Sequence, residues 1–201
     1  PRSTPLYSSA ASDVYKRQVE LHADIYWAIR QAVAWGIIVI EPVGNGGQDL
    51  KDLVSYCRCL PLDVDTGAIL TAACDIPLST GHKAHMSTNY GDRVVCYSWG
   101  ADIVTVRPGE KGVMALSAKS PTIEFDKTSG AATLVAGIAA QVQHQAMSTP
   151  GLNRFLTPSE MRAALTTVAS GAAPMIGTKK IGVLPNLEAI KSKYLPGMKK
   201  Q

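Results

Sequence analysis

The sequence predicts an α/β domain with a mostly parallel central sheet. Short apolar runs alternate with segments of helical period, as in domains built from strands and helices in turn. One of these runs, at 37–41, is almost entirely apolar and rich in β-branched side chains, which is typical of parallel strands. The 201 residues are 46% apolar, enough for one sizeable core, and they show no internal repeat. We therefore expect one domain.

The first helix and the first strand of this prediction are neighbours in the chain. Apolar or small residues follow helical spacing from Ile25 to Val33, and Gly36 stands where a helix would end. The run IIVIE follows at 37–41, and we expect it to be a strand that is buried on both faces. Two more strands are predicted, at 68–73 and 93–106.

Three helices are expected in the second half of the chain. The first is made of small residues and begins near Ser129. The second opens with Thr157, Pro158 and Glu160, which together form a capping box with proline at the first helical position. The third is a short helix at 185–194.

The two ends of the chain differ from its middle. Residues 1–18 have no helical or strand period and resemble a translated sequencing adapter, so we expect a non-native or disordered leader. Residues 191–201 are a polar basic tail. The two ends supply all of the net charge of +4, so the domain between them, residues 19–190, is not basic. This argues against a nucleic-acid partner, and no apolar run is long enough to span a membrane.

The four cysteines say little about a cofactor or a compartment. Cys57 and Cys59 have a spacing that could bind zinc, but no second close pair and no nearby histidine completes four ligands. We therefore expect no metal and no other cofactor. Four cysteines in a chain of this length neither require nor exclude disulfides, so the redox compartment is left open.

The glycine-flanked Asn45 lies where the first predicted strand ends, at the edge of the sheet where α/β domains bind ligands. The stretch GNGGQD could begin a dinucleotide-binding turn, with Asp63 or Asp65 as the acidic residue that follows. However, Asp49 occupies the third glycine position, where its carboxylate would face the pyrophosphate. The stretch could also be a purely structural glycine turn.

A third interpretation pairs this loop with the helix that begins near Ser129. A serine in the first turn of a helix has free backbone N–H groups and the positive helix end beside it, which suits a nucleophile whose attack creates an oxyanion. The Asn45 amide could supply a second donor, so Asn45 and Ser129 should converge at one edge of the sheet. Alternatively, Thr128 or Ser129 only caps a core helix.

Four segments, in this order, resemble the catalytic domain of subtilisin-like serine proteases, the subtilases. They are AVAWGIIVIEPVGNGG at 32–47, GAILTAACD at 67–75, HMSTNYGDRVVCYSWGADIVTV at 85–106 and KTSGAATLVAGIAA at 127–140. The resemblance extends over about 21–190. It implies a three-layer subtilisin-like α/β domain, a serine endopeptidase activity and a polypeptide substrate, with secretion as the usual location of the family. It gives no oligomeric state.

By this resemblance, each part of the loop and the helix start has a role. Ser129 is the nucleophile, and the Asn45 side chain is a donor of the oxyanion hole together with the Ser129 backbone N–H. Gly44, Gly46 and Thr128 are the neighbouring substrate-binding residues. The site therefore needs no cofactor.

The chain also departs from the family pattern. Lys127 stands where the family has glycine, and Ala132 and Thr133 replace the usual Ser-Pro. These departures leave open a degenerate subtilase that acts as a binding module.

The subtilase aspartate and histidine precede the oxyanion asparagine, and residues 19–44 contain no matching motif. We therefore expect that the N-terminal part of the catalytic domain is missing and that this chain alone is inactive. His82 and His85 come after Asn45, in segments that match later parts of the fold, so neither is expected to be the base.

Overall fold

The computed structural model describes residues 19–55, 65–75, 81–103, 107–108, 114–115, 126–166 and 175–198. The expected leader at 1–18, the pair Cys57 and Cys59, and Asp63 lie outside these ranges. The helices and turns are η1 (Val19–Leu21), α2 (Ala23–Ala34), α3 (Leu50–Ser55), α4 (Lys127–Ser148), α5 (Pro158–Thr166), α6 (Leu187–Ala189), η3 (Ile190–Tyr194) and η4 (Leu195–Gly197). None of these described helices combines the length and the apolar character that a membrane crossing requires.

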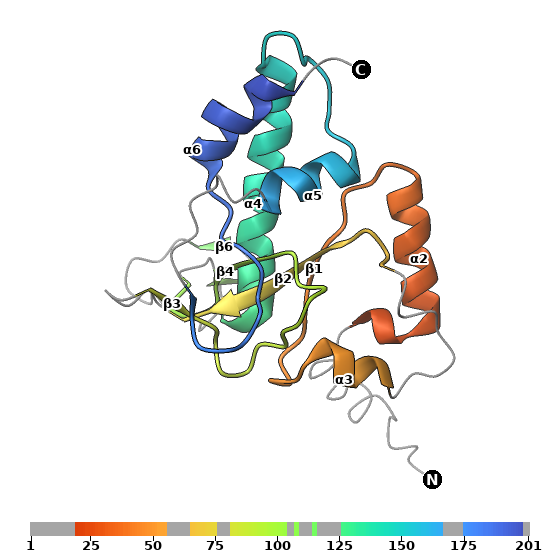
Figure 1. Ribbon diagram of the computed structural model, residues 1–201, viewed down its shortest axis with the longest axis vertical. Coiled ribbons are helices and arrows are strands. Elements are labelled where there is room, and N and C mark those ends of the chain that lie inside the picture. The colour runs from red at the N-terminus through yellow and green to blue at the C-terminus, as the bar shows by residue number, and fades with distance from the viewer. Residues whose placement is uncertain are drawn as a thin grey trace.

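A parallel sheet of three strands forms the centre of the described fold, in the order β1 (Ile40–Pro42), β2 (Ile69–Cys74) and β4 (Cys96–Trp99). Figure 1 shows the long helix α4 beside this sheet, with the strands crossing the lower part of the helix. Two small sheets lie outside it: β3 (His82–Lys83) pairs with β7 (Met175–Ile176), and β5 (Arg107–Pro108) pairs with β6 (Met114–Ala115).

Two apolar clusters cover the two faces of the central sheet, because successive side chains of a strand point to opposite faces. On one face, Ile69 and Cys96 pack with Val135 of α4 and with the α5 residues that lie beyond it. On the other face, Leu70 and Tyr97 belong to a second cluster, which also holds Leu50 at the start of α3 and three residues outside the central strands: Val43, Ala84 and Ile181. The fold therefore has the three layers expected of a subtilisin-like domain.

The first helix ends as predicted, but the strand after it is shorter and more exposed than expected. Gly36 has a φ of 85°, and the N–H of Ile37 donates to the carbonyl of Ala32, which closes the helix in a Schellman turn. Because that turn uses residue 37, β1 begins only at Ile40. The side chain of Ile37 is 51% exposed and that of Ile40 is half-buried. Among the described strands, β1 pairs with β2 alone and lies at the edge of the sheet. The prediction of burial on both faces was wrong.

The other predicted strands also have mixed outcomes. The strand at 68–73 is confirmed as β2. The strand at 93–106 was predicted too long, since β4 spans only Cys96–Trp99. Asp102 has a φ of 53°, a left-handed conformation that ends the extended chain, and residues 104–106 lie outside the described part.

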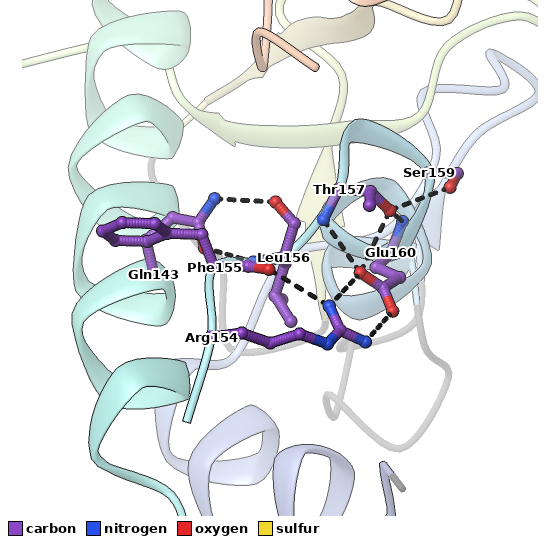
Figure 2. A network of polar contacts seen from close by, with 7 residues as sticks. All are labelled: Gln143, Arg154, Phe155, Leu156, Thr157, Ser159 and Glu160. Carbon is purple, nitrogen blue, oxygen red and sulfur yellow. Dashed lines mark hydrogen bonds and ion pairs between the residues drawn. The ribbon is translucent and has the colours of Figure 1, made fainter. Parts of the chain in front are cut away.

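The predicted capping box is present at the start of α5 (Figure 2). The Glu160 N–H donates to Thr157 Oγ1 over 3.3 Å, and the Thr157 N–H donates to Glu160 Oε2 over 2.8 Å. Arg154 donates to both Glu160 oxygens, over 2.8 and 2.6 Å. Beside this network, the Gln143 amide of α4 binds the Leu156 backbone at both its N–H and its carbonyl, over 2.7 and 3.0 Å. These bonds attach α5 to α4.

The capping carboxylate gives a pH-dependent prediction. The hydrogen bond from Arg154 lowers the pKa of Glu160 to about 2. Because this value lies below that of the unfolded chain, the carboxylate stabilises the fold above about pH 4.5, and this contribution is lost as the pH falls toward 2. The group lies near the surface, where solvent weakens ion pairs, so Glu160→Gln should lower the free energy of unfolding at pH 7 by about 1 kcal/mol.

Urea unfolding at several pH values measures this effect. Glu160→Gln should lose less stability than the parent between pH 4.5 and 2. Glu188→Gln is the matched control, because Glu188 is 83% exposed and lies 3.5 Å from Lys191. Equal acid sensitivity in the parent and in Glu160→Gln would contradict the assignment.

Candidate active site

The loop that carries Asn45 follows β1 and lies against the segment 87–90. Gly44 has a φ of 90°, a conformation that glycine adopts without strain, and it turns the chain out of the strand. Four backbone hydrogen bonds of 2.7 to 3.0 Å then join the two segments. The N–H groups of Asn89, Gly47, Tyr90 and Leu50 donate, respectively, to the carbonyls of Gly44, Ser87, Gln48 and Tyr90. The loop is therefore held along its length.

Ser129 is the third residue of α4, within the first turn of the helix. The Lys127 N–H donates to the Gly100 carbonyl over 2.7 Å, which attaches the helix start to the end of β4. Ser129 is exposed and Thr128 is buried. The helix N-cap is Asp126, whose side chain makes no capping bond, so the alternative in which Thr128 or Ser129 only caps the helix does not hold.

The loop and the helix start meet through one side chain. The Oδ1 atom of Asn45 accepts hydrogen bonds from the Thr128 N–H over 3.2 Å and from the Thr128 hydroxyl over 2.9 Å. Two donors at one amide atom identify it as the oxygen, because an NH₂ group there would face two other donors. The NH₂ group of Asn45 therefore points away from Thr128. It is a hydrogen-bond donor on a side chain that is bonded to Thr128, the residue directly before Ser129.

Asn89 contacts this loop from the other side, and the sequence analysis assigned it no role. Its side chain is fully buried. Its Oδ1 accepts from the N–H groups of Gly46 and Gln48, each over 3.0 Å, and its Nδ2 donates to the Val43 carbonyl over 2.8 Å. The available signal was an asparagine within the polar run STNYG at 87–91, just before the strand predicted at 93–106.

Comparison with protein families decides what this arrangement belongs to. The model of the subtilase family, Peptidase S8, matches residues 7–188. The chain belongs to the subtilase family. No curated protein sequence matches it. The dinucleotide-binding alternative is therefore set aside.

Solved subtilase-like structures have the same fold. One is a protease of Pseudoalteromonas arctica, which is 18% identical in sequence and superposes with a TM-score of 0.54. The match covers 82% of this chain and 45% of that protein. Another is fervidolysin of Fervidobacterium pennivorans, a keratinolytic enzyme, with 21% sequence identity and a TM-score of 0.58. The match covers 85% of this chain and 25% of that one. A third is the prenylagaramide maturation protease PagA, with 20% sequence identity and a TM-score of 0.57. The match covers 85% of this chain and 55% of that one. The chain thus spans about half of these proteins or less.

Lys127 is the residue of this subtilase site with an unfavourable backbone conformation. Its φ is 64°, in the left-handed region where a side chain costs about 1–2 kcal/mol. Glycine would remove this strain, although it adds about 0.5–1 kcal/mol of freedom to the unfolded chain. Lys127→Gly should therefore raise the free energy of unfolding by about 0.5–1 kcal/mol.

Urea unfolding with the matched substitution Gln141→Gly tests this sign. Gln141 is exposed within the same helix, so glycine there should lower the free energy of unfolding by about 1 kcal/mol. Destabilisation by both substitutions would show that the Lys127 side chain contributes more than its strained backbone costs.

The histidines of the described residues make their contacts elsewhere. His82 is buried, its Nδ1 lies 2.9 Å from the Tyr97 hydroxyl, and burial lowers its pKa. His85 Nδ1 lies 2.8 Å from Ser87 Oγ. The remaining histidines are exposed, at the start of α2 and on α4: His22 and His144. Within the described ranges, no hydrogen bond joins a histidine to Ser129.

The two cysteines that the structure describes are buried and free: Cys74 and Cys96. Burial raises the pKa of each thiol to about 12, so neither is a reactive thiolate at neutral pH. The described residues contain no cluster of three potential metal-binding side chains.

Proposed function

We propose that the chain carries the nucleophile and the oxyanion hole of a serine endopeptidase. Ser129 Oγ attacks the peptide carbonyl carbon, and the Asn45 NH₂ group and the Ser129 backbone N–H hold the oxygen that becomes negative. The observation that carries the proposal is the double hydrogen bond from Thr128 to Asn45, because it fixes the orientation of the Asn45 amide beside Ser129.

The neighbouring residues have supporting roles in this proposal. Gly46 carries no side chain next to Asn45, so a peptide backbone can approach the amide there, while the buried Gly44 turns the chain out of β1. Thr128 is buried and holds Asn45, while the exposed Ser129 faces solvent, from which substrate arrives. The substrate of the whole protein is a polypeptide.

The reaction also needs a base to take the Ser129 proton and return it to the leaving amine. We infer that this base and its aspartate partner are the histidine and aspartate that precede the oxyanion asparagine in subtilases. His82 and His85 bond elsewhere, and within the described ranges no hydrogen bond joins a histidine to Ser129, which supports this inference. The chain by itself should therefore hydrolyse peptides at a small fraction of the rate of the whole protein.

The test compares the chain alone with the chain joined to its natural upstream coding sequence. The longer protein should cleave peptides and should be labelled at Ser129 by a serine-directed phosphonate, whereas the chain alone should do neither at a comparable rate. Ser148→Ala is a control for labelling, since Ser148 is an exposed serine of the same helix. A longer protein with intact Asp and His motifs that neither cleaves nor is labelled would rule out the proposal.

That negative result would favour a second candidate, a degenerate subtilase that binds polypeptides without cleaving them. The strained Lys127 next to the proposed nucleophile is the observation that favours it, because active subtilases place glycine there. Retention of an unlabelled peptide by such a protein, measured by calorimetry, would support this function.

A further inference from the structure

The Asn89 side chain binds the backbone of the loop both before and after Asn45 in the sequence. Its carbonyl oxygen accepts the Gly46 and Gln48 N–H groups, which follow Asn45, and its NH₂ group donates to the Val43 carbonyl, which precedes it. One buried amide therefore spans the residues on either side of the proposed oxyanion donor.

Asn89 is itself fixed to the central sheet. The Ala73 N–H at the end of β2 donates to Thr88 Oγ1 over 3.1 Å. The Thr88 hydroxyl in turn donates to the backbone carbonyl of Asn89 over 3.1 Å. The backbone N–H of Asn89 donates to the backbone carbonyl of Gly44 over 3.0 Å. The side chain that holds the loop is thus anchored to a buried strand.

The loop needs such an anchor because glycines flank the residue that carries the donor. Asn45 lies between Gly44 and Gly46, and glycine has more backbone freedom than any other residue. An oxyanion donor is effective when it is already in place before the reaction, so that no rearrangement is needed in the transition state. Thr128 holds the tip of the Asn45 side chain, but the backbone beneath it is held by Asn89.

We propose that Asn89 is a positioning residue of the oxyanion hole, which acts by fixing the backbone that carries the Asn45 amide. The inference rests on the proposed function. It differs from a structural role in one respect: loss of Asn89 should lower catalysis by the folded enzyme specifically through Asn45.

The experiment uses the chain joined to its natural upstream sequence. Asn89→Ala should lower kcat by about 10- to 100-fold, with KM changed less than about threefold, because the misplaced donor acts mainly in the transition state. In an Asn45→Ala background, where the donor is already absent, Asn89→Ala should lower kcat less than about threefold further. Rates are expressed per folded molecule, from the amplitude of the unfolding transition.

Gln143→Ala is the matched control, because Gln143 also holds a loop backbone through both ends of its amide, at Leu156. It should reduce stability while leaving kcat unchanged. If Asn89→Ala does not fold, Asn89→Asp replaces it: this isosteric side chain retains an acceptor for the Gly46 and Gln48 N–H groups and loses the donor to Val43. Its kcat should fall relative to that of the parent enzyme, and again only while Asn45 is present.

Two results would overturn the inference while leaving the proposed function intact. One is an active parent enzyme whose kcat is unchanged by either Asn89 substitution. The other is an equal loss of kcat with and without Asn45, which would show that Asn89 supports the fold in general. An inactive parent enzyme would instead overturn the proposed function, and the inference with it.

Discussion

Ser129→Ala is expected to abolish peptide hydrolysis by the chain joined to its natural upstream sequence. The substitution removes the oxygen that would form the acyl-enzyme, so the covalent route is closed. The size of this loss, about 10⁶ in kcat, is known for subtilisin itself and is carried over from that enzyme.

The same substitution should leave the fold unchanged. Ser129 is exposed in the first turn of α4, and alanine is a better helix former than serine, so the free energy of unfolding should stay within about 0.5 kcal/mol. Peptide turnover and urea unfolding are measured on the same preparation, with Ser148→Ala as the control. Turnover above about a thousandth of the parent rate in a folded Ser129→Ala protein would show that Ser129 is not the nucleophile.

Local sequence signals predicted the elements whose causes are local. The capping box of Thr157 and Glu160 forms because the two residues are three apart, and Gly36 ends α2 because it adopts a positive φ there. Strand β2 was predicted well because it is buried along its whole length. Errors arose at the ends of the predicted strands, because the turn that ends α2 takes up Ile37 and the left-handed Asp102 interrupts the extended chain after β4.

The candidate site shows the same division. That Asn45 and the start of α4 lie together follows from the rule that parallel strands end at one edge of a sheet, so the sequence could predict it. That Thr128 is the donor to Asn45 depends on contacts between residues 83 positions apart. The role of Asn89 depends on separations of 41 to 46 positions, which no local pattern reports.

Asn45→Asp is expected to lower kcat of the longer protein by about 10²- to 10³-fold, with little change in KM. One carboxylate oxygen can still accept from the Thr128 N–H and hydroxyl, so the side chain should keep its orientation. The other oxygen replaces the NH₂ group, so the oxyanion loses a donor and faces a negative charge instead. Substrate binding changes little because the neutral carbonyl of the ground state gains less from this donor than the oxyanion does.

Steady-state kinetics on a peptide substrate separate kcat from KM for this variant. Asn153→Asp is the matched control, since it makes the same chemical change at an exposed asparagine after α4 and should leave both constants unchanged. A variant whose KM rises while kcat stays constant would mean that Asn45 binds the substrate equally in the ground state and the transition state. In that case the double hydrogen bond from Thr128 would hold a substrate-binding side chain, and the oxyanion hole would have to be sought among backbone N–H groups such as that of Ser129.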